Sequence, residues 1–123
     1  MRNEDADALE NRLIDFGALI ITLTDQLPAT KAATHISQQL LRSGTSPAPN
    51  YGEARGAESR ADFIHKLRVA VKEMNETQVW LKMMIRSKLA AQGLVGPVLD
   101  ECQQLARILN ASVKTARGNG GSE

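Results

Sequence analysis

Aromatic residues are scarce in this 123-residue sequence, which contains only Phe16, Tyr51, Phe63 and Trp80. A hydrophobic core must therefore consist mainly of Leu, Ile, Val, Met and Ala, most of which are good helix formers. No segment alternates β-branched or aromatic residues with polar ones, as a half-buried strand requires. The composition therefore predicts an all-α protein, and the length fits a single domain.

Cysteine and long apolar runs are almost absent as well. Cys102 is the only cysteine, so no disulfide can form within the chain, and we expect a buried structural thiol. The longest apolar stretch, residues 16–21, is much shorter than the ~18 residues that a membrane-spanning helix needs. Acidic residues crowd the N-terminus, where a secretory signal would be basic and then apolar. These features predict a cytoplasmic protein with no membrane contact.

Residue patterns that support catalysis are also missing. Only His35 and His65 could act as bases near neutral pH, and neither belongs to a recognisable nucleophile motif. A di-iron bundle needs two Glu-x-x-His units, whereas this chain offers only Asp62-x-x-His65. The glycines between residues 44 and 56 lack the Lys-Ser/Thr ending of a phosphate-binding loop. We therefore predict that the protein is not an enzyme and has no catalytic residues, metal site or cofactor.

What the sequence does contain is helical periodicity, in four segments. Apolar residues in each segment recur at intervals of three and four, which places them on one side of an α-helix. In the first segment they are Leu9, Leu13, Phe16, Ile20, Leu23 and Leu27. Pro28 follows and lacks the N–H that would continue the helix, so the first helix should span about residues 6–26.

The boundaries of the other three helices depend on capping and helix-breaking residues. Local chemistry predicts a second helix that ends near Ser43 and a loop after it, because prolines and glycines fill residues 44–56. Ser59 and Asp62 resemble a capping box that starts a third helix, which should run to about residue 91. Pro97 suits the first turn of a fourth helix.

Four amphipathic helices, each with one face to bury, pack best as an antiparallel up-and-down four-helix bundle. The spacing of their apolar residues favours left-handed packing with crossing angles of about 20°. We expect this bundle to occupy residues 1–117 and the glycine-rich tail, residues 118–123, to be disordered.

Charge is nearly balanced over the chain, with a formal net charge of +1, but it is unevenly distributed. Residues 1–27 carry a net charge of −4, whereas residues 53–90 carry +3. Within the predicted third helix, a sector of about 80° opposite the apolar stripe holds Arg68, Lys72, Lys82 and Arg86. This sector is either a footprint for the phosphate backbone of RNA or DNA or an ordinary solvated face, and no aromatic residues are interleaved for base stacking.

The third helix also has more apolar surface than one stripe requires. Trp80, Met83 and Met84 lie on the flank between the apolar stripe and the basic sector. Tryptophan and methionine are found both in cores and at subunit interfaces. These three residues are therefore candidates for a contact between subunits as well as for the core.

Three stretches resemble a family of four-helix-bundle proteins named for the intervening sequences of bacterial 23S ribosomal RNA genes. Ser59-Arg-Ala-Asp-Phe-Ile-His-Lys-Leu-Arg-Val-Ala resembles the opening of the family's third helix. Asn75-Glu-Thr-Gln-Val-Trp-Leu81 resembles its Asn-Glu-Thr-x-x-Trp-Leu continuation, and Ile108-Leu-Asn-Ala-Ser-Val-Lys-Thr-Ala-Arg117 resembles its closing segment. The likeness covers roughly residues 9–117.

This resemblance implies a cytosolic bundle without known catalytic residues, commonly assembled as a ring-like homopentamer and of largely unassigned role. Some relatives are accessory proteins that bind a reverse transcriptase and nucleic acid. The family carries its second helix through a proline-containing stretch that matches residues 46–54 here. The resemblance implies a helix in place of a loop, and because Pro49 and Gly52 depart from the family pattern, we predict a second helix that is kinked or interrupted at Pro47 and Pro49.

Two hypotheses about function remain open at the level of sequence. The first is a homo-oligomeric accessory protein that binds RNA or DNA through the basic sector of the third helix. The second is a protein-binding or purely structural oligomer that makes no contact with nucleic acid.

Overall fold

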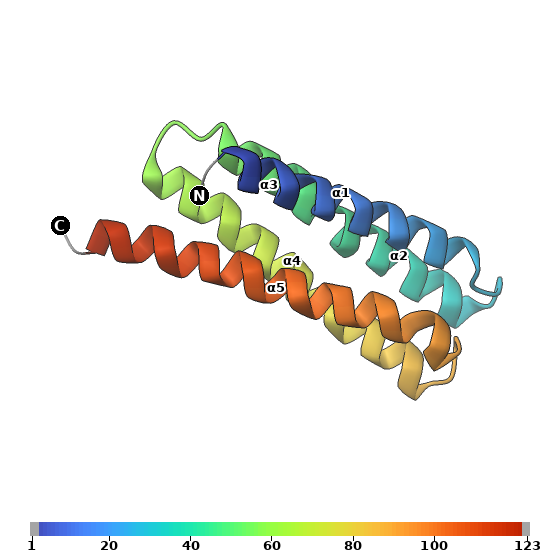
Figure 1. The fold of residues 1–123 in the computed structure, drawn as a ribbon. Helices are drawn as coiled ribbons and strands as arrows, with labels where there is room; N and C mark the ends of the chain where they lie inside the picture. The colour runs from blue at the N-terminus through green and yellow to red at the C-terminus, as the bar shows by residue number, and fades with distance from the viewer. Residues whose placement is uncertain (1–2, 122–123) are drawn as a thin grey trace.

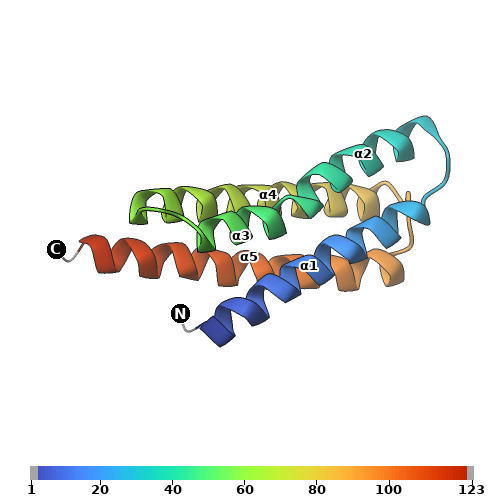
Figure 2. The ribbon, with the colours of Figure 1, turned by 90° about the horizontal axis from the view of Figure 1, so that it is seen from above.

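The computed structural model describes residues 3–121, which contain helices and turns but no strands. The helices are α1 (Asn3–Asp25), α2 (Lys31–Thr45), α3 (Pro47–Arg55), α4 (Arg60–Arg86) and α5 (Gln92–Gly121) (Figure 1). α2 and α3 follow one another along the same side of the molecule and together take the place of one helix in a four-helix bundle (Figure 2). The all-α, four-helix arrangement predicted from the sequence is confirmed.

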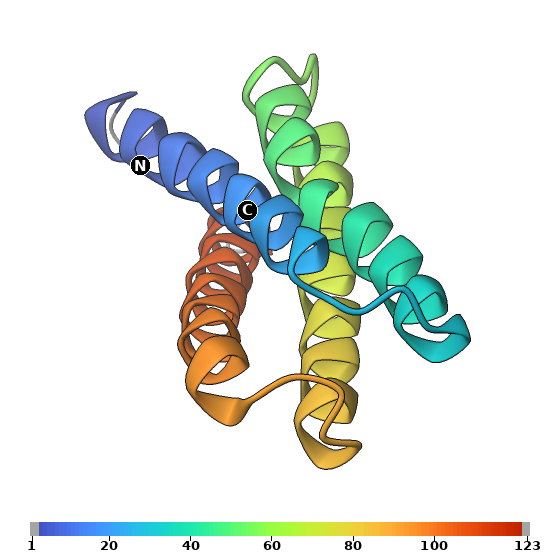
Figure 3. The ribbon, with the colours of Figure 1, turned by 90° about the vertical axis from the view of Figure 1, so that its right-hand side faces the viewer.

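α1 and α4 occupy opposite corners of this bundle. α4 packs against α2, α3 and α5, and α1 packs against the same three helices. Among the described residues, no pairing of α1 with α4 brings their backbones as close as either helix comes to α2, α3 and α5. α1 crosses its neighbours obliquely, and its N-terminal end diverges from the C-terminal half of α5 (Figures 2 and 3). The outer faces of α1 and α4 therefore point to different sides of the molecule.

The core consists of the apolar stripes that the spacing predicts. Its largest fully buried side chains come from α1, α2, α4 and α5, and are Leu13, Phe16, Ile20, Leu23, Leu40, Leu67, Met74, Leu81, Met84, Val95, Leu105 and Leu109. Burying one such side chain contributes about 1.5–3 kcal/mol relative to leaving it exposed. None of the helices described is both long enough and apolar enough to span a membrane.

The break between α2 and α3 is set by Pro47. Proline has no N–H to donate to the carbonyl four residues earlier, so one helix ends and a new one starts at this residue. Asn50 closes the first turn of α3, because its backbone N–H and its side-chain amide both donate to the carbonyl oxygen of Ser46, at 3.2 and 3.0 Å. The loop predicted here from local chemistry is wrong, since residues 47–55 form a helix that buries Tyr51.

The ends of the other helices also differ from those predicted. α4 ends at Arg86, about five residues early, and Lys88 turns the chain with a left-handed φ of 61°. α5 starts earlier than predicted, so Pro97 lies inside it and not in its first turn. Pro97 leaves the carbonyl of Gly93 without a helical partner, and Gly93 is exposed to water. α5 continues as far as Gly121 into the tail expected to be disordered, whose last two residues lie outside the described residues.

The crossing of α1 and α2 places two buried glycines, Gly17 and Gly44, close together. A Cβ atom on Gly44 would lie 2.8 Å from Cγ1 and 3.0 Å from Cγ2 of Ile20. Ile20 is fully buried and β-branched, so its side chain has no free rotamer into which to move. A Cβ atom on Gly17 would lie 3.8 Å from its nearest neighbour, the Cα of Thr45, at ordinary van der Waals distance. The crossing therefore requires glycine at position 44 but not at position 17.

We expect Gly44→Ala to destabilise the protein by about 1–3 kcal/mol, the usual cost of overpacking a core. Gly17→Ala is the matched control and should leave the stability unchanged or raise it by up to about 1 kcal/mol, because alanine is the better helix former. Urea unfolding followed by circular dichroism gives both free energies of unfolding. Equal midpoints for the two variants would contradict this account of the crossing.

Candidate functional site

The four basic residues predicted as a candidate site lie together on the outer side of α4. Arg68, Lys72, Lys82 and Arg86 are all exposed, opposite the buried stripe of the helix. Within residues 3–121, the side chains of Arg68, Lys82 and Arg86 make no hydrogen bond or ion pair. Lys72 is close enough to Glu76 to help lower the pKa of its carboxyl, although a hydrogen bond from Trp80 is the larger cause. We call these four residues the α4 ridge.

Other cations of the protein act differently, because they join one helix to another. Arg12 of α1 donates two hydrogen bonds to the carboxylate of Glu101 on α5, at 2.8 and 2.7 Å. The hydrogen bond from Arg12 to Glu101 also raises the pKa of the guanidinium. Ion pairs between helices include Arg12–Glu101, Arg42–Glu73, Arg42–Glu76, Arg55–Asp7, Arg55–Glu10 and Lys66–Glu53. The cations of the α4 ridge are thus not used in holding the helices together.

Apolar side chains interrupt the α4 ridge. Val79 is 49% exposed and Met83 is 47% exposed, and helical spacing places Val79 among the cations of the ridge and Met83 along its edge. Contact with phosphate alone does not call for exposed apolar groups. The outer side of α4 is therefore a mixed basic and apolar surface.

The three candidate subunit-interface residues occupy three different environments. Met84 is fully buried in the core, which corrects its assignment to a subunit contact. Trp80 is half-buried between α4 and α2, and Met83 is exposed. Of the three, Met83 is the most exposed, at 47%.

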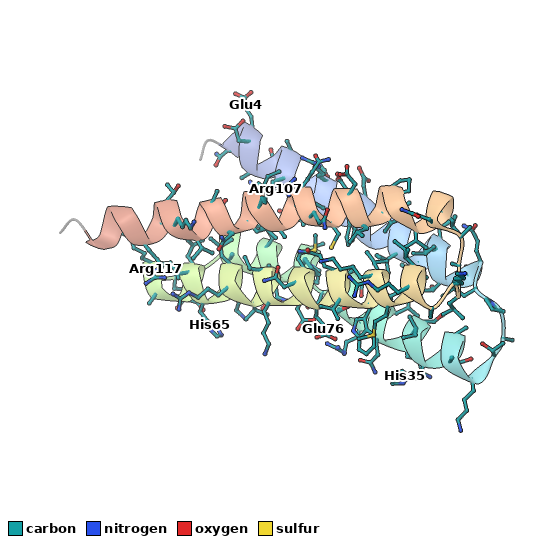
Figure 4. All side chains as sticks on the ribbon, turned by 90° about the horizontal axis from the view of Figure 1, so that it is seen from below. Glu4, His35, His65, Glu76, Arg107 and Arg117 are labelled. Carbon is teal, nitrogen blue, oxygen red and sulfur yellow. The ribbon has the colours of Figure 1, made fainter. Side chains whose placement is uncertain are left out.

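Sequence analysis missed a second set of cations, which lies on α5. Arg107, Lys114 and Arg117 are exposed, and α5 packs along the length of α4 (Figure 4). Arg107 and Lys114 are seven residues apart and so share one face of their helix, which is a signal present in the sequence. Only the antiparallel pairing of α4 with α5 places these residues beside the α4 ridge.

Clusters of metal ligands and deep clefts are the usual marks of an active site. Among residues 3–121, no group of three His, Cys, Asp or Glu side chains could hold a metal ion. A hollow of about 1030 Å³ lies where α1 diverges from α5 and is lined by residues that include Tyr51, Phe63 and Ile108. No histidine or cysteine of the described chain lines it, and its acidic lining residues are Asp5 and Glu58.

Comparison with known proteins identifies the family of this chain. Residues 9–111 match the family described as 23S rRNA-intervening sequence protein. The chain belongs to this family. It is 33% identical to a protein of unknown function from the S23 ribosomal protein family of Bacteroides thetaiotaomicron, whose crystal structure superposes with a TM-score of 0.82. That likeness covers 89% of this chain and 97% of the other. No curated protein matches the chain.

In this member of the family, side chains of the segment 75–81, which resembles a family motif, join α4 to α2. The indole N–H of Trp80 donates to the carboxylate of Glu76 at 2.9 Å, and the same carboxylate accepts a hydrogen bond from Arg42 of α2. His35 of α2 meets the Trp80 ring edge-on, with the ring centroids 5.8 Å apart. Figure 4 shows Glu76 and His35 along the same edge of the molecule, on α4 and α2.

Thr77, in the same segment, contributes a second contact between these helices inside the core. Its hydroxyl lies 2.8 Å from the carbonyl oxygen of Glu73 and 2.9 Å from the hydroxyl of Ser43 on α2. Both hydroxyls are fully buried, so this pairing avoids the cost of leaving them unsatisfied. The segment thus serves mainly the fold of this family member, and Asn75 and Val79 are its residues that remain exposed on the outer side of α4.

Cys102 is buried, as predicted, and is not placed to act as a nucleophile. Its side chain is fully buried, and its Sγ donates to the carbonyl oxygen of Met74 at 3.4 Å. Burial, with a smaller effect from Glu101, raises the pKa of the thiol from its ordinary value of 9.0 to about 12. The thiol is therefore neutral in the folded protein at physiological pH.

We expect iodoacetamide to alkylate Cys102 in the folded protein at pH 8 on the order of 10³ more slowly than in the urea-unfolded chain, because the thiolate fraction falls tenfold per unit of pKa. Between pH 9 and about 12 the unfolded chain ionises this thiol and the folded protein does not, so stability should fall as pH rises. Mass spectrometry of timed samples measures the alkylation. Equal rates for folded and unfolded protein would contradict the burial of Cys102.

Proposed function

We propose that this protein is a non-catalytic, cytoplasmic scaffold that assembles with itself and binds nucleic acid through the α4 ridge. The observation that carries the proposal is the exposure of Arg68, Lys72, Lys82 and Arg86 on one side of one helix, where three of the side chains have no ion-pair partner among residues 3–121. Cations that are not engaged within the fold are free to neutralise phosphates, and each phosphate contact releases counterions.

The neighbouring helix supports the same interpretation. Arg107 and Lys114 of α5 are exposed beside the α4 ridge, so that a single face of the protein carries cations from two helices. Contacts to phosphate position a nucleic acid without reading its sequence. Binding through this face should therefore be tolerant of sequence and sensitive to salt.

Self-assembly is supported by exposed apolar side chains at opposite corners of the bundle. Ile14 and Ile21 are 50% and 48% exposed and share one face of α1, while Val79 and Met83 are exposed on α4. Faces that differ and point to different sides of a molecule favour head-to-tail contacts, which close into rings. We take the number of subunits, five, from the ring-like homopentamer that the family resemblance implies.

A second candidate function is a purely structural or protein-binding oligomer. The observation that favours it is the same pair of exposed side chains, Val79 and Met83, within the α4 ridge. A subunit or another protein seated on them would cover part of the ridge and shield its cations from phosphate. Measurements of binding and of mass on the same variants distinguish the two candidates.

We expect the wild-type protein to bind single-stranded nucleic acid, with an affinity that falls on the order of 10³ between about 50 and 200 mM salt. The Arg68→Glu/Lys82→Glu variant should bind more weakly and show a slope of log affinity against log salt smaller by about 1.4, at roughly 0.7 per lost phosphate contact. Lys31→Glu/Lys88→Glu changes the net charge equally, at exposed positions off the ridge, and should bind like the wild type. Fluorescence anisotropy measures all three proteins. Wild-type protein that does not bind at low salt, or equal loss in both variants, would refute the nucleic-acid role.

We expect light scattering to give about 67 kDa, five times the 13.4 kDa of one chain. Ile21→Lys should lower this mass, because it places a charge in the apolar face of α1 proposed to meet another subunit. Leu19→Lys is the control, since Leu19 is similarly exposed, at 41%, but on a different side of α1. A wild-type mass of one chain at micromolar concentration would refute self-assembly, and equal dissociation of both variants would refute the assignment of the face.

A further inference from the structure

A small groove runs between the outer surfaces of α4 and α5. Its volume is about 370 Å³, and its least exposed lining residues are Val71 and Ala106. Its polar lining consists of four carboxamides and one guanidinium, from Asn75, Gln78, Gln103, Asn110 and Arg107. We call these five polar residues and the space between them the amide groove.

The carboxamides of the amide groove are hardly used by the fold. Gln78 donates to the side-chain oxygen of Asn75 at 3.3 Å, which is long for a hydrogen bond. Within the part of the chain that the structure describes, the side chains of Gln103 and Asn110 make no hydrogen bond. Each carboxamide offers two donor hydrogens and an acceptor oxygen. The groove therefore presents a cluster of donors and acceptors to solvent.

Cations flank the amide groove on both helices. Arg68 and Lys82 belong to the α4 ridge, and Lys114 lies two turns beyond Arg107 on α5. Asp100 is the acidic residue on the outer side of α5 that is nearest in sequence to the groove residue Gln103. Its carboxylate accepts a hydrogen bond from the side-chain amide of Gln104 at 2.7 Å. A ligand with anionic groups along its length and polar edges between them would match this arrangement.

We infer that the amide groove binds single-stranded RNA, with its carboxamides hydrogen-bonded to base edges and ribose 2′-hydroxyls and the flanking cations holding the phosphates. This inference rests on the proposed function and adds the class of ligand to it. Asn and Gln pair with base edges because one side chain both donates and accepts. A single strand fits because its bases can be turned toward the protein, whereas the major groove of duplex RNA is too narrow for side chains to read.

Recognition in this groove relies on hydrogen bonds and on Arg107. Its lining residues include no aromatic side chain on which a base could stack. The planar guanidinium of Arg107 is the group within the groove that can stack on a base. The 2′-hydroxyl, which both donates and accepts, gives the carboxamides a partner that DNA lacks.

The test compares three proteins: the wild type, the groove variant Gln78→Ala/Gln103→Ala/Asn110→Ala, and the control variant Asn11→Ala/Gln38→Ala/Gln92→Ala. The control removes three exposed carboxamides that lie outside the groove. Alanine is a good helix former, so each variant should keep its helical circular dichroism spectrum. Fluorescence anisotropy with labelled, unstructured RNA and DNA oligonucleotides of the same base sequence gives each affinity across a range of salt.

We expect the wild type to bind RNA more tightly than DNA. The groove variant should lose on the order of tenfold in RNA affinity and bind RNA and DNA alike, because three hydrogen-bonding groups are removed. Its dependence on salt should not change, because the phosphate contacts remain. The control variant should match the wild type.

A groove variant that keeps the wild-type RNA affinity and the wild-type preference for RNA would overturn this inference. If Arg68→Glu/Lys82→Glu still weakened binding and lowered its salt dependence in that case, the proposed function would stand without the groove. A wild type that binds RNA and DNA equally would also overturn the inference and leave the α4 ridge as a general phosphate-binding surface. A wild type that binds neither nucleic acid would refute the proposed function itself.

Discussion

The burial of one side of α4 is the constraint on which the remaining structure depends. The stripe Leu67, Ala70, Met74, Thr77, Leu81 and Met84 is buried against α2, α3 and α5. An α-helix has only one contiguous side to bury in this way, so its opposite side faces water. Packing of the buried stripe holds α4 in place and keeps the α4 ridge at the surface. The cations of the ridge do not take part in that packing.

Charge in this protein is divided between two uses. Arg12 and Arg55 each reach a carboxylate on a neighbouring helix, and such partly exposed pairs contribute little to stability, typically about 0–1 kcal/mol. Their main effect is to favour one alignment of the helices over others. Arg68 and Lys82 have no such partner within the described residues, so their fields extend into solvent. This division separates surfaces that shape the bundle from the surface proposed to meet a ligand.

The outer surface of α4 and α5 combines three kinds of groups at short range. The α4 ridge supplies cations, Val79 and Met83 supply exposed apolar area, and the amide groove supplies hydrogen-bonding groups. Assembly through the apolar residues and nucleic-acid binding through the cations would draw on the same helix. The amide groove lies to the α5 side of the ridge, so it can remain accessible when a second subunit approaches α4 from the α2 side.

Local periodicity determined the fold class, the core stripes and the outward direction of Arg68, Lys72, Lys82 and Arg86, because each follows from the 3.6-residue repeat within one helix. The same repeat did not predict that Met84 is buried and Met83 exposed, because the burial of a residue at the edge of an apolar stripe depends on how closely the next helix packs. The local sequence of residues 47–55 predicts a loop, because proline and glycine disfavour a helix interior. A helix forms there because Tyr51 packs against the core, which only the tertiary structure shows.

The requirement for glycine at position 44, the cations of α5 beside the α4 ridge and the amide groove were decided by the tertiary structure alone. Each depends on which residues of two different helices come to lie side by side. That placement is set by the register and crossing of packed helices, and no pattern within a single helix records it.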